Sequence, residues 1–256
     1  PHVNAAELEY IEQDRAEEEA AKAAAAEAAK NEKKISLWKC FTYKQTWAFA
    51  FGKFLPDGVW WFFLFWMPSF LKNVYGMKST EPQFQIAIGA LYLIVMLSIF
   101  GGYLPTIFIE KKKMNPYAGR MRAMLIFAFF PLVALGALPL SHISYWIPVV
   151  LIGIAAAAHQ SWSANIFSTV GDMFPKNTIA TVTGIGGMAG GIGSFLVQKG
   201  AGLLFDASEA GGWNILGCEG IQAGYLIMFT FCGLAYLVSW VIMKSLVPQY
   251  KPISIE

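Results

Sequence analysis

The sequence predicts an all-α membrane protein with six transmembrane helices, preceded by a helical arm outside the membrane. Of its 256 residues, 56% are apolar and only 14% are charged, whereas an ordinary soluble domain has about 25% charged residues. Six apolar stretches also reach the roughly 20 residues that a spanning helix needs. This composition excludes a disordered chain, a collagen-like repeat and a small disulfide scaffold. The net charge of +2 does not favour nucleic acid as a partner.

The first 44 residues differ in composition from the rest of the chain. They hold nine of the 17 acidic residues and seven of the 19 basic residues. The stretch from Ala5 to Lys30 is rich in Ala, Glu and Lys, which favour helix, and it has no continuous apolar face. We therefore interpret residues 1–44 as a solvated helical arm. Because such an arm begins directly at Pro1, we expect the sequence to start inside a longer polypeptide.

The candidate spanning helices lie within residues 45–247, and residues 248–256 form a short tail. The fifth stretch is rich in glycine, and the third is the shortest. The six stretches are Gln45–Asn73, Phe84–Ile109, Met121–Leu140, Tyr145–Thr169, Thr178–Leu204 and Ile221–Val247.

The connections between these stretches alternate in basic charge, which predicts the orientation. Lys and Arg concentrate in short loops on the cytoplasmic side of a membrane. The loop after the second stretch carries Lys111, Lys112, Lys113, Arg120 and Arg122, and the next loop on that side carries Lys176. The opposite loops hold only Lys72 and Lys78. We therefore expect the basic loops, the arm and the tail to be cytoplasmic.

The sequence carries no pattern typical of a metal site, a cofactor site or an enzyme. Its cysteines, Cys40, Cys218 and Cys232, have no CxxC or metal-ligand spacing. The HExxH motif of zinc proteases is absent, and Ser194 has no histidine on a later helix to serve as its base. We expect no metal, no cofactor and no enzymatic activity.

Two charged residues lie inside the first apolar stretch. Lys53 and Asp57 are four residues apart, which places them on one helix face, and Pro56 beside Asp57 predicts a kink or a break. A charge within the membrane usually faces a cavity or a partner. The functional interpretation is a basic group in a substrate cavity, tuned or paired by the acid. The alternative is a structural ion pair, or a lysine that reaches to the membrane surface.

The fourth stretch carries a dense group of polar residues, so this part of the helix should face the bundle interior. A membrane histidine can relay protons or donate a hydrogen bond to a substrate, but polar residues also hold helices together. A tryptophan can stack on a sugar or simply pack. These candidates are His159, Gln160, Trp162, Ser163 and Asn165.

The fifth stretch contains two pairs of glycines with small-xxx-small spacing. Gly186 and Gly190 form one pair, and Gly187 and Gly191 form the other. Such pairs allow two helices to approach closely. A nucleotide-binding glycine loop would need a strand before it, so we interpret all four glycines as helix-packing residues.

Four segments resemble the C-terminal half of a major facilitator superfamily transporter. KFLPDGVWWFFLFWMPSFL is similar to the family's seventh transmembrane helix, HQSWSANIFSTVGDMFPKN to its tenth helix, and TGIGGMAGGIGS to its eleventh. PHVNAAELEYI resembles the start of the family's central cytoplasmic loop. Within the superfamily, the chain most resembles the anion:cation symporter branch and, in that branch, bacterial hexuronate transporters.

The resemblance implies one six-helix half of a major facilitator bundle in a bacterial inner (plasma) membrane. This half would alternate access with an N-terminal half that the chain lacks. The substrate would be a hexuronate or a related sugar-acid anion, taken up with protons. The family's proton-coupling carboxylates and a main substrate arginine lie in that N-terminal half.

The resemblance also implies roles for single residues. Lys53 would neutralise the substrate carboxylate, with Asp57 beside it, and Trp61 and Phe65 would line the sugar. The residues from His159 to Asn165 would offer hydrogen bonds to hydroxyl groups. Two other functions stay open. One is transport of another organic anion, such as a dicarboxylate, an aromatic acid or a sugar phosphate, and the other is a non-transporting membrane scaffold.

Overall fold

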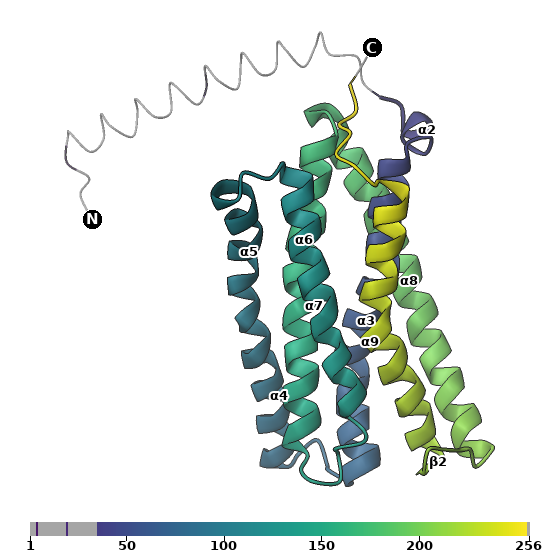
Figure 1. Cartoon of the computed structure of the whole chain (residues 1–256). Coiled ribbons are helices and arrows are strands. Elements are labelled where there is room, and N and C mark those ends of the chain that lie inside the picture. Colours follow the sequence, from purple (N-terminus) through teal and green to yellow (C-terminus); the bar gives the residue numbers. More distant parts are fainter. Residues whose placement is uncertain (1–3, 5–18, 20–34, 255–256) are drawn as a thin grey trace.

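The computed structural model describes Asn4, Glu19 and residues 35–254. Nearly all of the predicted arm, with its helix, lies outside the described residues. The described chain is a bundle of long helices that run side by side (Figure 1).

The long helices follow one another through short connections. After the short helix α2 (Leu37–Cys40) comes α3 (Lys44–Tyr75). The next rod combines α4 (Pro82–Val95), the 3₁₀ segment η1 (Met96–Gly102), α5 (Tyr103–Thr106) and the π-helical η2 (Ile107–Lys111). Then follow α6 (Pro116–Phe129) with the 3₁₀ segment η3 (Phe130–Gly136), α7 (Trp146–Met173), α8 (Lys176–Ala210) and α9 (Ile221–Leu246). A two-stranded antiparallel hairpin, β1 (Asn214–Ile215) and β2 (Cys218–Glu219), joins α8 to α9.

Five helical segments are long and apolar enough to cross a membrane. They are Pro82–Lys111, Pro116–Gly136, Trp146–Met173, Lys176–Ala210 and Ile221–Leu246. Helix α3 is 32 residues long and is not among the five. Its sequence mixes four charged residues and two prolines with its aromatic residues, and this mixture lowers its mean hydropathy. The first of the six predicted spans therefore stays a proposal.

The structure has no break at Pro56, because α3 is one continuous helix that contains both Pro56 and Pro68; the kink that Pro56 also indicates stays a prediction. The irregular helical geometry lies in the second predicted span instead. The predicted span Phe84–Ile109 changes from α-helix to 3₁₀ and then to π-helix near its end. Mid-membrane departures of this kind need neighbouring helices to satisfy the displaced backbone groups.

Local signals explain where several helices begin and end. Ser36 caps α2, since its Oγ accepts a bond from the Lys39 backbone N–H at 3.3 Å. Asn115 caps α6 in the same way, with its Oδ1 2.8 Å from the Ala118 nitrogen and Pro116 at the first helical position. Helix α3 ends at Gly76, whose φ of 66° is the left-handed conformation that favours glycine.

The basic connections gather at one end of the bundle. Figure 1 shows the described chain ends at the same end as the connections α5–α6 and α7–α8. These connections carry Lys111–Lys113 and Lys176. The β1–β2 hairpin lies at the opposite end. The fold therefore separates charge between its two ends, as an oriented membrane bundle does.

A seam of glycines lets α8 lie directly on α3. A Cβ added at Gly186 would overlap the Phe49 ring, and one added at Gly193 would overlap the backbone oxygen of Phe54. By contrast, Gly187 and Gly191 are exposed, and nothing described lies within 4 Å of a Cβ added at either. The packing role predicted for Gly187 and Gly191 is thus not found within the described residues, because they point about 100° away from the seam.

Replacing Gly193 by alanine should destabilise the bundle. The new Cβ meets a backbone oxygen, which cannot rotate aside, so we expect a loss of about 1–3 kcal/mol. Gly200→Ala on the same helix is the matched control, since a Cβ there has open space and alanine favours helix. Thermal unfolding in detergent measures both variants, and equal effects would contradict the close α3–α8 contact.

Candidate functional site

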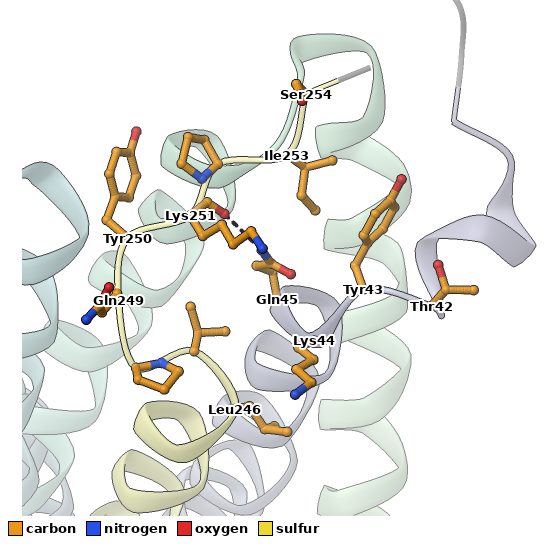
Figure 2. A pocket seen from close by; sticks show the side chains of 13 residues that line it. Thr42, Tyr43, Lys44, Gln45, Leu246, Gln249, Tyr250, Lys251, Ile253 and Ser254 are labelled. Atoms are coloured by element: carbon orange, nitrogen blue, oxygen red, sulfur yellow. Dashed lines mark hydrogen bonds between the residues drawn. The ribbon is translucent and has the colours of Figure 1, made fainter. Parts of the chain in front are cut away.

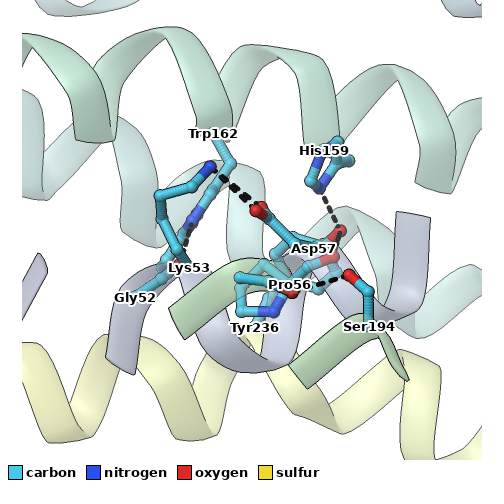
Figure 3. Close-up of polar contacts among 9 residues, drawn as sticks. Gly52, Lys53, Pro56, Asp57, His159, Trp162, Ser194 and Tyr236 are labelled. Carbon is cyan, nitrogen blue, oxygen red and sulfur yellow. Dashed lines mark hydrogen bonds and ion pairs between the residues drawn. The ribbon is translucent and has the colours of Figure 1, made fainter. Parts of the chain in front are cut away.

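Lys53 and Asp57 form an ion pair within α3 (Figure 3). The Lys53 Nζ lies 2.8 Å from Asp57 Oδ2 and 3.2 Å from Oδ1. The two side chains are 7% and 18% exposed, so the pair is largely withdrawn from solvent. The ammonium also lies 4.4 Å from the centroid of the Phe167 ring on α7, which adds a cation–π attraction. One carboxylate and one ring therefore compensate this lysine.

Helix α8 makes room for the Asp57 carboxylate at a glycine. A Cβ added at Gly190 would overlap Asp57 Oδ2, so a larger residue there would force the carboxylate to move. The Ser194 hydroxyl turns back to its own helix and donates to the Gly190 carbonyl at 2.7 Å. Gly190 thus does more than bring two helices together, since it admits the acid that pairs with Lys53.

His159 is held in a fixed orientation by two aromatic residues. Its ring stacks on Trp60, with centroids 5.1 Å apart and an interplanar angle of 14°. Its Nδ1 lies 2.8 Å from the Tyr236 hydroxyl, and this hydroxyl donates to the Pro56 carbonyl at 3.3 Å. Both bonds are satisfied together when Nδ1 carries a proton. No sequence pattern indicated a role for Tyr236, which lies in the apolar helix α9.

Trp162 is buried and does not line an open cavity. It is 1% exposed, and its indole N–H donates to the Gly52 carbonyl of α3 at 3.0 Å. Its ring packs edge-on against Tyr236, with centroids 5.6 Å apart. The geometry favours the packing alternative for this residue over sugar stacking.

Other predicted site residues are more accessible. Trp61 and Phe65 stack on each other at 5.4 Å and are 38% and 60% exposed. They continue the face of α3 that carries Lys53 and Asp57, at successive four-residue steps. On α7, Gln160 and Ser163 are half-buried.

Asn165 lies on a different side of α7 from the ion pair. Its Nδ2 donates to the Ser161 carbonyl at 2.8 Å, and its Oδ1 is buried without a hydrogen-bond partner. The side chain borders a cavity of about 310 Å³ with Arg120 and Thr106. No residue of α3 lines that cavity, so the structure does not bring Asn165 together with Lys53.

Another cavity lies at the end of the bundle where the described chain ends. It measures about 760 Å³ and lies between the start of α3 and the chain that follows α9 (Figure 2). Gln45 bridges its two walls by donating to the Lys251 carbonyl at 2.8 Å. None of the predicted site residues lines it. Within residues 35–254, no group of three or more His, Cys, Asp or Glu side chains could hold a metal ion.

Comparison with known proteins gives the family. The Major Facilitator Superfamily model matches residues 10–198. A hexuronate transporter of Escherichia coli (strain K12) is 26% identical over 213 residues, which are 83% of this chain and 46% of that protein. The hexuronate transporter of Escherichia coli O157:H7 gives the same values. A galacturonate transporter of Dickeya chrysanthemi is 30% identical over 90 residues, which are 35% of this chain and 26% of that protein.

The chain thus spans about half the length of the curated hexuronate transporters that it matches. No solved structure gives a significant match. The family model covers well over half of the chain, and the helical bundle agrees with it. This chain, with its paired charges inside a bundle of apolar helices, belongs to the Major Facilitator Superfamily and is similar to hexuronate transporters.

Proposed function

We propose that this chain is the C-terminal half of a proton-coupled transporter for a hexuronate or a related sugar acid. The observation that carries the proposal is the Lys53–Asp57 pair, withdrawn from solvent inside the bundle, in a chain 26% identical to hexuronate transporters. A hexuronate is a sugar with one carboxylate, so its binding calls for one cation among hydrogen-bonding groups and flat apolar surfaces.

The proposed half consists of α3 and the five apolar helical segments that follow it. The match to about half of each relative supports a second, N-terminal half that packs on this one and alternates access with it. In this arrangement residues 1–44 form the cytoplasmic arm, residues 45–247 the six-helix bundle, and residues 248–256 the cytoplasmic tail. The basic end of the bundle faces the cytoplasm of a bacterial cell.

Lys53 binds the substrate carboxylate by exchanging one acid partner for another. The Asp57 carboxylate already pairs with the Lys53 ammonium at 2.8 Å. The carboxylate of an incoming substrate therefore competes with Asp57 for the ammonium. The released Asp57 would be an unpaired charge inside the membrane bundle, which costs about 2.5–3.5 kcal/mol. Proton uptake removes that charge. The substrate and the proton are then transported together. Asp57 acts as a proton carrier in addition to the proton-coupling carboxylates of the N-terminal half.

Residues around the pair suit the rest of a sugar acid. The exposed, stacked rings of Trp61 and Phe65 offer an apolar surface to a sugar face. The half-buried Gln160 and Ser163 offer hydrogen bonds to its hydroxyl groups. A transporter for another organic anion would use Lys53 in the same way, so the alternative substrates differ in these neighbouring contacts. A scaffold would gain nothing from the ion pair.

Lys53→Ala should abolish the high-affinity uptake of labelled glucuronate by the intact transporter in vesicles. Loss of a charge-assisted bond to a carboxylate should raise KM by about 10–100-fold. Lys78→Ala, which removes an exposed lysine, is the matched control and should transport normally. Because Lys53→Ala strands Asp57, the double variant Lys53→Ala/Asp57→Asn separates misfolding from lost binding. Unchanged uptake by Lys53→Ala would contradict the assignment of Lys53 to substrate binding. If the unmodified protein takes up no glucuronate, the proposed hexuronate substrate is wrong.

Asp57→Asn should uncouple substrate movement from the proton gradient. The amide still accepts a bond from Lys53 but cannot release a proton, so counterflow exchange of glucuronate should persist. Accumulation driven by an imposed proton gradient should fall. Accumulation that stays at the level of the unmodified protein would contradict a proton role for Asp57.

A membrane-impermeant maleimide added to intact cells should label Cys218. This residue lies half-exposed in the hairpin between α8 and α9, at the end that we place outside. Cys40 and Cys232 are buried, and burial raises the pKa of the Cys40 thiol, so its reactive thiolate is scarcer. Cys218→Ser should abolish labelling. Labelling of Cys218 only after the membrane is opened would reverse the orientation.

A further inference from the structure

Pro56 leaves a carbonyl of α3 without its normal helical donor. In an α-helix each carbonyl accepts from the N–H four residues later, so the donor for Gly52 would come from position 56. Proline has no N–H, and its ring also crowds that carbonyl. The helix nevertheless continues through Pro56. An unpaired carbonyl in an apolar bundle costs free energy, and a group from outside α3 can remove this cost.

Trp162 supplies such a group from α7. Its indole N–H donates to the Gly52 oxygen at 3.0 Å (Figure 3), in a site where the tryptophan is 1% exposed. A Cβ at Gly52 would overlap the Ile166 side chain on α7 and that of Met243 on α9, so the glycine brings these two helices close to this turn of α3. The indole N–H thus gives the Gly52 carbonyl a donor in place of the missing proline N–H.

A second bond holds the same turn from α9. The Tyr236 hydroxyl donates to the Pro56 carbonyl at 3.3 Å. The carbonyls of residues 52 and 56 are therefore both held by other helices. Lys53 lies between them and directly follows Gly52, so the direction of its side chain depends on this turn.

We propose that Trp162 is a positioning residue: its indole caps the carbonyl that Pro56 frees and thereby directs Lys53 toward its anionic partner. The structural part of this inference stands on the hydrogen bond itself. The functional part rests on the proposed function, in which Lys53 binds a sugar-acid carboxylate. Trp162 touches no substrate in this account and acts through Gly52.

The test is a mutant cycle in the intact transporter. Trp162→Phe keeps an aromatic ring but removes the donor, and we expect the KM for glucuronate to rise about 10-fold with a smaller change in maximal rate. Pro56→Ala restores a backbone N–H to Gly52. The double variant should therefore have nearly the KM and melting temperature of Pro56→Ala alone.

The control is a second indole that bonds a carbonyl without a proline nearby. The Trp240 N–H donates to the Met121 carbonyl at 2.8 Å, between α9 and α6. Trp240→Phe should lower the melting temperature, leave the KM unchanged and gain nothing from Pro56→Ala.

Two results would overturn the inference. One is a Trp162→Phe defect that Pro56→Ala does not reduce, and the other is an equal rise in KM in Trp240→Phe. If the unmodified protein transports no glucuronate, the proposed function fails by itself. The melting temperatures of the four proteins in the cycle then still decide whether the indole replaces the proline N–H.

Discussion

The ion pair between Lys53 and Asp57 places two charges inside a bundle of apolar helices. An ammonium and a carboxylate inside an apolar bundle are tolerated only where close partners compensate them. The Phe167 ring approaches the ammonium, and α8 has glycine at position 190, where a side chain would overlap the carboxylate. Residues of α3, α7 and α8 thus surround the two charges. Apolar residues of similar size often stabilise a fold as well as a buried ion pair does, and this supports the proposal that the pair has a functional role.

Neighbouring helices also supply hydrogen bonds to the backbone of α3 next to the ion pair. Pro56 removes a hydrogen-bond donor next to the charges, and Trp162 and Tyr236 bond carbonyls at this turn of α3 from two other helices. His159 joins the arrangement through Tyr236 and stacks on Trp60. His159 and Trp162 of α7 therefore bond to groups of the protein itself, while the exposed Trp61 and Phe65 stay available for contact with a ligand.

Spacing within one helix could be predicted from the sequence, but contacts between helices could not. The four-residue separation of Lys53 and Asp57 was enough to predict that they share one helix face, where the structure has them paired. The polar face around His159 was correctly expected to be interior, yet periodicity does not tell which neighbour a residue meets, so Trp162 and Asn165 were placed in one cavity. Gly187 and Gly191 repeat the spacing of Gly186 and Gly190, and only the position of α3 distinguishes them. Gly193 and Tyr236 carried no signal, because each is an ordinary residue in its own helix and matters through another.

A charge swap between Lys53 and Asp57 tests most directly whether the Lys53 ammonium binds the substrate carboxylate. Lys53→Asp/Asp57→Lys keeps the net charge and the i,i+4 pair but moves the ammonium by about one helical turn, roughly 6 Å. Binding of glucuronate to the purified intact transporter can be measured by calorimetry, with a melting curve to confirm folding. We expect a folded protein that no longer binds the sugar acid, because the cation has left its place. A swapped protein that binds glucuronate with unchanged affinity would contradict this expectation, and would show that the pair only holds α3 in the bundle.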